Sequence, residues 1–212
     1  MRTCLGRGIA LGALALLSGC TVNNYNQTVE APVAEAEITS QSERRAMDGV
    51  EIATPLPTDV RRASIIVRDM DKSLAFWRDA LGLELNYDVE VTLSGVNLPV
   101  GEPGTKARLV LLNGNDPYLG WVGLLQPLDP PLPDVDEPYP TRLSSGMALM
   151  VVNTDDADAR CAAAAAVEGT LMTGPPRLQV YPGRDGRPDI RVRGCNVFDP
   201  DGIAVEINQL LD

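Results

Sequence analysis

Residues 62–82 read RASIIVRDMDKSLAFWRDALG, and within this stretch the spacing of apolar residues changes from strand-like to helical. Ala63, Ile65 and Val67 occupy alternate positions, which is the pattern of a half-buried strand. Four apolar residues then recur at helical spacing: Met70, Leu74, Trp77 and Leu81. The stretch therefore predicts a strand followed directly by a helix, with a second strand beginning after the helix.

Turn-forming residues mark where the next elements begin and end. Asp69 or Asp71 can cap the helix, and Gly82 can end it in a left-handed conformation. The residues NGNDP at 113–117 suit a hairpin turn. Two apolar runs flank this turn: residues 108–112 and 119–125. Together these signals predict a βαβββ unit.

The same order of elements returns in the second half of the chain. After a proline-rich joint at 127–143, a strand is expected at 147–152 and a helix at 156–167. A closing hairpin, with strands near 191–198 and 204–210, surrounds the turn DPDG. The repeat predicts an α+β fold of two βαβββ modules, at about 60–127 and 144–212, within one domain at 59–212.

The amino-terminal residues have the features of an export signal. Arg2 and Arg7 precede an apolar run at 9–17 that is too short to span a bilayer. The run ends in LSGC at 17–20, which resembles the bacterial lipobox, so we expect a signal peptide at 1–19 and acyl chains, palmitate included, on Cys20. The alternative is an ordinary signal peptide with an incidental cysteine.

The residues after Cys20 predict a location and a tether. Thr21 follows the cysteine where Asp would retain many Gram-negative lipoproteins at the inner membrane, so the outer membrane, facing the periplasm, is expected. Residues 20–58 are polar and show no sustained period, which is typical of a flexible tether.

The charge balance and the absence of histidine exclude several classes of function. The chain has 18 Lys and Arg against 29 Asp and Glu, a formal net charge of −11. Such a chain is repelled by nucleic acid, because affinity for nucleic acid comes mostly from neutralised phosphates. Without histidine, it cannot form a Ser-His-Asp or Cys-His nucleophile, a histidine general base or a histidine-ligated metal site.

Two phrases in the folded region carry a resemblance to a known family. IVRDMDKSLAFWRDALG at 66–82 and FDPDGIAVEI at 198–207 resemble the first strand and helix and the closing hairpin of the vicinal oxygen chelate superfamily, the glyoxalase, bleomycin-resistance and extradiol-dioxygenase group. The resemblance implies a curved mixed sheet around a cleft, often with a divalent metal at its centre. The superfamily includes lyases, epimerases, dioxygenases and drug-binding proteins, so the fold does not settle the function.

The resemblance also allows the metal site to be tested residue by residue. In the superfamily, ligands project from the first and last strands of each module, and the matching positions are Arg62, about Gln126, Met147 and Glu206. Only Glu206 is a good ligand, because a guanidinium repels cations, a thioether is soft and an amide is weak. We therefore expect no metal and no cofactor. We hypothesise that Arg62 forms an ion pair with Glu206 instead, since an unpaired buried charge is costly.

Strand alternation indicates which other side chains face the expected cleft. If Arg62 points into it, Ser64 does too, and Ala63 packs on the helix. A tight DPDG turn places Asn196 opposite Glu206. Asn196 and Ser64 are therefore candidate ligand contacts, although Asn196 is equally well interpreted as a solvated strand residue. Met147 and Leu149 are interpreted as an apolar wall for a ligand or as core filling.

The same turn places Cys195 opposite Ile207, on the side of the second helix. Cys161 lies on the apolar stripe of that helix, so both cysteines point into one layer. In an oxidising compartment they can form a disulfide if their Cα atoms lie within about 7 Å. Two buried thiols are the alternative.

Five arginines crowd one stretch: Arg177, Arg184, Arg187, Arg191 and Arg193. One interpretation is an electropositive rim of the cleft that recruits an anionic ligand. We favour the other interpretation, a solvated loop and edge strand whose arginines pair with nearby acids.

Three functions remain open, and we rank them. The first is a lipid-anchored envelope protein whose metal-free domain binds a small organic ligand. The second is a glyoxalase-type lyase or isomerase with Glu206 as its catalytic base, and the third is a degenerate fold used for protein-protein contacts. The expected partners are the membrane, a small molecule and, because modules of this superfamily pair within one chain or between two, a second copy of the chain.

Overall fold

The computed structural model describes residues 58–133 and 140–211. The predicted signal peptide, the proposed lipidation site Cys20 and almost all of the predicted tether lie outside the described residues. Within the described part of the chain, no helix is long and apolar enough to cross a membrane.

The first module is one four-stranded mixed sheet, sheet A, with a short helical segment. Its strand order is β1-β4-β3-β2, with β1 parallel to β4 and the other neighbours antiparallel. The elements in chain order are β1 (Arg62–Ile66), α1 (Met70–Leu74), the π-helical η1 (Ala75–Ala80), β2 (Glu84–Thr92), β3 (Lys106–Asn113) and β4 (Trp121–Asp129).

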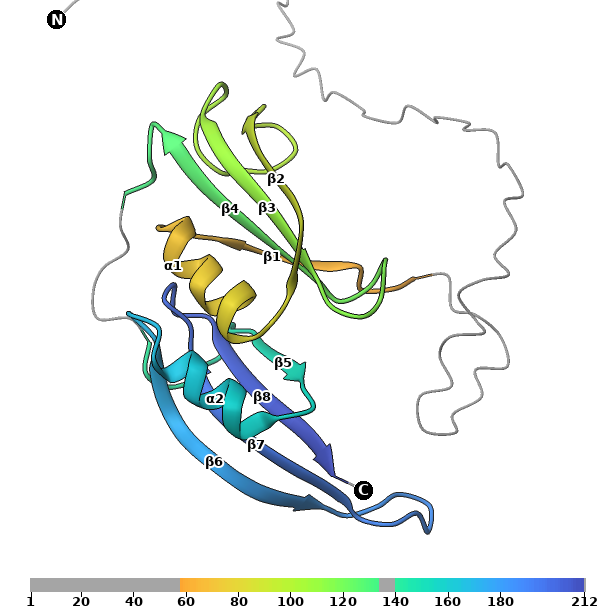
Figure 1. Cartoon of the computed structure of the whole chain (residues 1–212). Helices are drawn as coiled ribbons and strands as arrows, with labels where there is room; N and C mark the ends of the chain where they lie inside the picture. The colour runs from red at the N-terminus through yellow and green to blue at the C-terminus, as the bar shows by residue number, and fades with distance from the viewer. Residues whose placement is uncertain (1–57, 134–139, 212) are drawn as a thin grey trace, which may run out of the picture. The chain divides into compact units, whose positions relative to one another are not determined.

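The second module repeats this arrangement as sheet B, in the order β5-β8-β7-β6, with β5 parallel to β8. Its elements are β5 (Leu149–Asn153), α2 (Ala157–Ala165), β6 (Leu171–Tyr181), β7 (Ile190–Phe198) and β8 (Ala204–Leu211). Each helical segment lies across one face of its own sheet (Figure 1). The expected α+β fold of two βαβββ modules is confirmed.

Aspartate caps and a glycine with positive φ set the ends of the helices. Asp69, rather than Asp71, caps α1, because its carboxylate accepts the backbone N–H groups of Asp71 and Lys72 at 3.0 and 3.2 Å. Gly82 has φ +80°, the left-handed conformation expected after the helix. Asp156 caps α2 by accepting the N–H of Ala159 at 3.0 Å.

One hydrophobic core spans both modules. Phe76 and Trp77 of η1 are fully buried in the same cluster as Cys161 and Ala164 of α2. The small alanine side chains of α2 let this helix lie close to its neighbours. The faces of the two sheets that carry Leu124 and Ile207 also line this core, so the opposite face of each sheet points away from it.

A buried carboxylate joins the modules at the turn between β7 and β8. Asp199 is 1% exposed, and its Oδ2 accepts the indole N–H of Trp77 at 2.9 Å. Its Oδ1 accepts the backbone N–H groups of Asp201 and Ile203 at 2.9 and 2.7 Å. The turn residue of the second module is therefore held by the helical segment of the first.

Asp201 adds a second contact between the modules at the same turn. Its carboxylate accepts the Ser73 hydroxyl at 2.7 Å and the Arg68 backbone N–H at 2.9 Å. The Arg68 guanidinium donates to the carbonyl of Pro200 at 2.6 Å.

A disulfide joins Cys161 of α2 to Cys195 of β7, with the two Cα atoms 6.2 Å apart. Both residues are fully buried in the core. They are 34 residues apart in the chain, and closing a loop of this length stabilises the fold by about 3 to 4 kcal/mol in the chain-entropy model.

We expect the carboxyl group of Asp199 to make stability depend on pH. Burial raises the pKa of Asp199 to about 6, although the N–H donors that it accepts oppose this shift. An acid whose pKa is higher in the folded state contributes stability at low pH, and this contribution is lost as the pH rises through about 6. The free energy of unfolding in urea should therefore fall by about 1 kcal/mol, from this group, between pH 5 and pH 7.5.

The variant Asp199→Asn should lose this part of the pH dependence. It should also be less stable than the wild type, because the amide N–H of Asn would face the Trp77 N–H. The control is Asp185→Asn, at an exposed loop position with φ +54° that Asn tolerates, and it should keep the wild-type pH dependence. Equal slopes for the wild type and Asp199→Asn would contradict the prediction.

Candidate functional site

The face of sheet B that points away from the core carries the predicted polar pair. Asn196 of β7 lies opposite Glu206 of β8, and Val151 of β5 lies on the other side of Glu206. Cys195 pairs with Ile207 on the core side. The register predicted for the closing hairpin is confirmed, and we call this side, with Asn196 and Glu206, the open face of sheet B.

The open face of sheet A carries Arg62 and Ser64, which pair with Trp121 and Gly123 of β4. A Cβ atom at Gly123 would lie 3.2 Å from Arg62 Cδ and 3.1 Å from Ser64 Oγ. The Arg62 side chain therefore lies over Gly123, in space that any larger residue would occupy.

Gln126, expected in the cleft, points to the opposite side of sheet A. Its Oε1 accepts the N–H of Met70 at 3.3 Å, and its Nε2 donates to the carbonyl of Arg68 at 2.8 Å. Gln209 of β8 makes the equivalent bonds to Ala157 and Asp155 at the start of α2. Assigning Gln126 to the cleft was wrong, because this glutamine fixes the turn between strand and helix.

The repeated glutamines identify the residue that corresponds to Glu206. Glu206 lies three residues before Gln209, and Gly123 lies three residues before Gln126. Gly123 pairs with the first strand of its module as Glu206 does, so the position in sheet A that matches Glu206 has no side chain.

The residues at the expected metal positions do not fit a metal ion. Arg62 is cationic, Gly123 offers no ligand, and Met147, just before β5, offers only a thioether, which leaves Glu206 alone. No group of three or more Cys, Asp or Glu side chains could hold a metal ion among residues 58–133 and 140–211.

The hypothesised ion pair between Arg62 and Glu206 does not form within one chain of the structure. No ion pair or hydrogen bond joins these side chains in the described part of the chain. The physical reason is that they belong to different sheets, where Arg62 lies over Gly123 and Glu206 lies beside Asn196. Glu206 is only half-buried, so solvent reduces the cost of leaving it without a cation.

A pocket of about 460 Å³ is hollowed into sheet B. Leu149 of β5, Asn196 and Phe198 of β7 and Ala204 of β8 contribute to its wall, and residues 141–143, at the end of the proline-rich joint, border it. Its lining is Thr141, Arg142, Leu143, Leu149, Thr173, Gly174, Arg177, Asn196, Val197, Phe198, Ala204 and Val205. Asn196, a predicted ligand contact, and Leu149, interpreted as part of an apolar wall, line this pocket; Arg62, Ser64, Gln126, Met147 and Glu206 do not.

Arg177 reaches the pocket because β6 is irregular. Pro175 and Pro176 cannot donate backbone hydrogen bonds, and the pairing with β7 shifts register on both sides of Gly174. A Cβ atom at Gly174 would lie 2.8 Å from Arg177 Nη1 and 3.2 Å from Asn196 Nδ2. The guanidinium and the carboxamide therefore meet over a residue that has no side chain.

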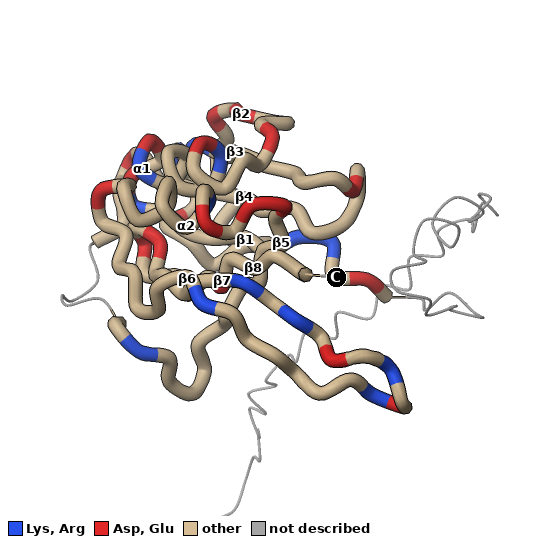
Figure 2. Tube along the Cα trace, turned by 60° about the horizontal axis from the view of Figure 1, so that its bottom comes forward, with Lys and Arg blue, Asp and Glu red and all other residues tan. Residues whose placement is uncertain are grey.

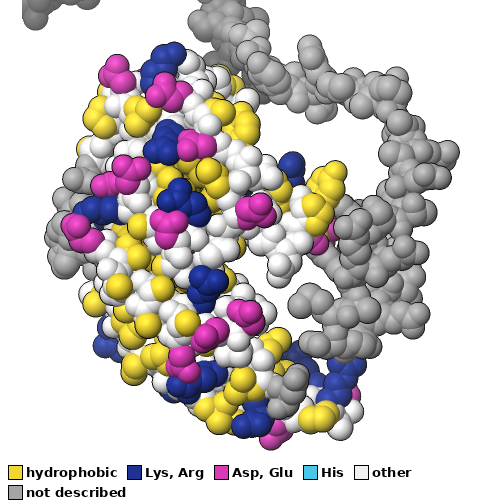
Figure 3. Space-filling model, viewed as in Figure 1, with side chains coloured by type: hydrophobic (Ala, Val, Ile, Leu, Met, Phe, Trp, Pro, Cys, Tyr) yellow, Lys and Arg dark blue, Asp and Glu magenta, His cyan; other side chains and the backbone are white. Residues whose placement is uncertain are grey.

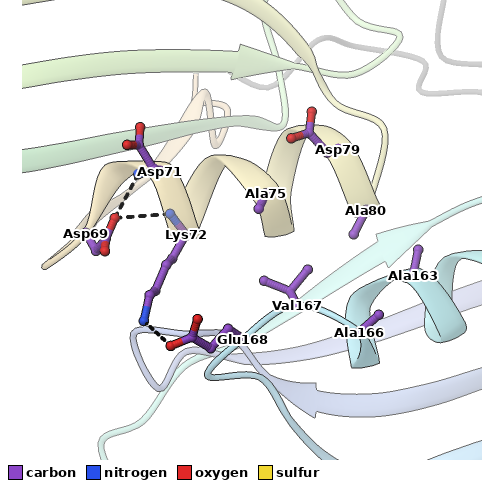
Figure 4. A pocket seen from close by; sticks show the side chains of 10 residues that line it. All are labelled: Asp69, Asp71, Lys72, Ala75, Asp79, Ala80, Ala163, Ala166, Val167 and Glu168. Atoms are coloured by element: carbon purple, nitrogen blue, oxygen red, sulfur yellow. Dashed lines mark hydrogen bonds and ion pairs between the residues drawn. The ribbon is translucent and has the colours of Figure 1, made fainter.

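A second hollow, of about 690 Å³, lies between the helical segments of the two modules (Figure 4). Its apolar part consists of small residues and one valine: Ala75, Ala80, Ala163, Ala166 and Val167. Lys72 donates to Glu168 across the hollow at 2.7 Å. Asp69 caps α1, and the hydrogen bond from Arg78 lowers the pKa of Asp79. The charged groups of this hollow are thus partnered, which indicates a junction rather than a reactive site.

Charge is distributed unevenly over the molecule. Basic residues lie along the β6–β7 hairpin and its loop (Figure 2). On the face seen in Figure 3, basic and acidic side chains are interspersed. Of the five clustered arginines, Arg193 is paired with Asp158 at 2.6 Å, as expected for a solvated strand residue, whereas Arg177 lines the pocket.

Sequence reasoning missed Arg142 and Gly174 as pocket residues. The position of Arg142, directly before the second module, was a weak signal. The Gly-Pro-Pro run at 174–176 was a stronger signal, because such a run interrupts a strand and redirects the residue that follows.

The comparison with family models finds one match. The model of the Glyoxalase/Bleomycin resistance protein/Dioxygenase superfamily matches residues 59–207. A search of curated proteins finds no match.

The comparison with solved structures finds similar chains from several bacteria. A glyoxalase family protein from Bacillus cereus is 17% identical, with a TM-score of 0.55 over 76% of this chain and 99% of that chain. The antibiotic binding protein TnmS3 from Streptomyces sp. CB03234 is 22% identical, with a TM-score of 0.38 over 74% and 100% of the two chains. At these identities, the likeness to the Bacillus cereus protein establishes the fold alone.

We expect the protein not to retain a divalent metal ion. After dialysis against Mn²⁺ or Zn²⁺ and removal of free ions, elemental analysis should find fewer than about 0.1 ions per chain, because a single carboxylate is a weak site. The variant Glu206→Gln should give the same value. About one ion per chain in the wild type, lost in Glu206→Gln, would contradict this prediction.

Proposed function

Since the chain belongs to the glyoxalase/bleomycin resistance protein/dioxygenase superfamily, we propose that it binds a small organic molecule without a metal and is held at the cell envelope by lipid on Cys20. The observation that carries the proposal is the pocket in sheet B, which combines an apolar wall with a few polar groups. Ligand pockets in proteins have this composition.

The pocket favours binding over catalysis. An acid-base mechanism of the lyase or isomerase type needs a positioned group to take a proton and commonly a second group or metal to stabilise the developing charge. Glu206 is the carboxylate nearest in register to the pocket, and no Asp, Glu, Lys, Tyr or Cys side chain is among the pocket's lining residues. Binding a small molecule requires only a cavity of suitable shape, apolar contacts and hydrogen-bonding groups, and the pocket has these features.

A second copy of the chain is a further part of the proposal. The open faces leave apolar side chains in solvent, and Ile66 of sheet A and Val151 of sheet B are 37% and 60% exposed. Pairing the open faces of two chains would bury these residues and would cover the pocket.

The binding proposal is tested with a neutral fluorescent probe, N-phenyl-1-naphthylamine. We expect saturable binding to one site per chain that weakens about tenfold in Leu149→Asn, because a polar side chain replaces part of the apolar wall. The matched control is Leu178→Asn, since Leu178 has similar exposure, 47% against 41%, but pairs with Arg193 on the other face of sheet B. Absence of binding, or equal loss in both variants, would contradict the proposal.

The lipid anchor is tested by expressing the full chain in a Gram-negative host. The wild type should be labelled by palmitate and sediment with the outer membrane, and Cys20→Ser should be unlabelled and soluble after signal removal or remain with its signal at the inner membrane. The control Cys4→Ser should behave as the wild type does. Membrane attachment and labelling that persist in Cys20→Ser would contradict the lipid anchor.

A further inference from the structure

The pocket in sheet B is lined by two arginines, Arg142 and Arg177, and by no acidic residue. This lining contrasts with the chain as a whole, whose formal net charge is −11. Two positive charges that border one hollow, with no acid among its lining residues, favour an anion there over a cation.

The guanidinium groups of Arg142 and Arg177 are also unpaired. Other arginines have carboxylate partners: Arg78 with Asp79, Arg108 with Asp88 and Arg193 with Asp158. Within residues 58–133 and 140–211, neither the Arg142 guanidinium nor the Arg177 guanidinium makes an ion pair or a hydrogen bond. Their donors therefore remain available to a ligand, and a guanidinium can hold a planar carboxylate through two parallel bonds.

The backbone of β6 holds one of these groups in the pocket. Gly174 leaves space for Arg177 Nη1, and Asn196 Nδ2 approaches the same point from β7. Apolar side chains complete the lining, among them Leu143, Leu149 and Phe198. The pocket thus has a cationic, hydrogen-bonding part and an apolar part.

Glu206 limits where an anion can lie. It shares the open face of sheet B and pairs with Asn196, but it is not among the residues that line the pocket. An anionic group would be repelled by this carboxylate, so it should lie at the Arg177 side of Asn196.

We propose that this pocket binds an amphipathic organic anion, a molecule that joins a carboxylate or similar acidic group to an apolar ring or chain. Arg142 and Arg177 hold the acidic group, and Leu149 and Phe198 contact the apolar part. This inference rests on the proposed binding function and specifies the chemical class of its ligand.

The test compares two probes that differ in one acidic group. The anion 8-anilinonaphthalene-1-sulfonate has the same aromatic system as the neutral N-phenyl-1-naphthylamine, so the ratio of their dissociation constants measures the contribution of the acidic group. For the wild type at low salt, we expect the anion to bind at least about tenfold more tightly, and we expect added salt to reduce this preference.

Variants assign the preference to the two arginines. In the double variant Arg142→Gln and Arg177→Gln, the two probes should bind within about twofold of each other. Both arginines are exposed and unpaired, so folding should be unaffected, which melting temperatures would check. The control is the double variant Arg184→Gln and Arg187→Gln, which removes the same number of charges from the exposed loop after β6 and should keep the preference.

The outcomes separate this inference from the function on which it rests. Equal binding of both probes to the wild type, with loss in Leu149→Asn, would overturn the anion preference and leave small-molecule binding standing. A preference that persists in the double variant would overturn the role of the two arginines. Failure of both probes to bind would overturn the inference together with the proposed function.

Discussion

The structure depends on one buried hydrogen bond, from the indole of Trp77 to the carboxylate of Asp199, because it fixes how the two modules meet. The Asp199 side chain is 1% exposed, so its carboxylate needs hydrogen-bond donors from the protein. The indole of Trp77 and the backbone N–H groups of Asp201 and Ile203 supply them. The bond joins the β7–β8 turn to η1 and so keeps the helical segments in a shared core. Each sheet then has one face against that core and one face open, and the pocket lies on the open face of sheet B.

The two open faces differ at the position where a carboxylate could serve as a ligand. Sheet B has Glu206 there, whereas sheet A has Gly123, over which Arg62 lies. A guanidinium in this position repels a cation, and Gly123 offers no ligand to hold one. The protein thus keeps the fold of its superfamily while its residues provide a pocket of arginine, amide and apolar groups instead of a set of metal ligands.

Much of the fold could be predicted because the signals were local. The cap at Asp69, the left-handed Gly82 and the pairing of Asn196 with Glu206 each follow from a few neighbouring residues. The site was harder to predict, because it depends on which way a strand faces and on which sheets come together. Gln126 was assigned to the wrong face for the first reason, and the absence of a pair between Arg62 and Glu206 within one chain reflects the second. Arg177 was grouped with solvated arginines because the effect of Pro175 and Pro176 on its direction appears only in three dimensions.

The most direct test of a metal-independent binding pocket is a crystal structure of the protein grown with both Mn²⁺ and N-phenyl-1-naphthylamine. We predict density for the probe against Leu149 and Phe198, with no anomalous signal from manganese beside Glu206. Manganese bound to Glu206 and contacting the probe, or a probe bound only outside sheet B, would contradict the account.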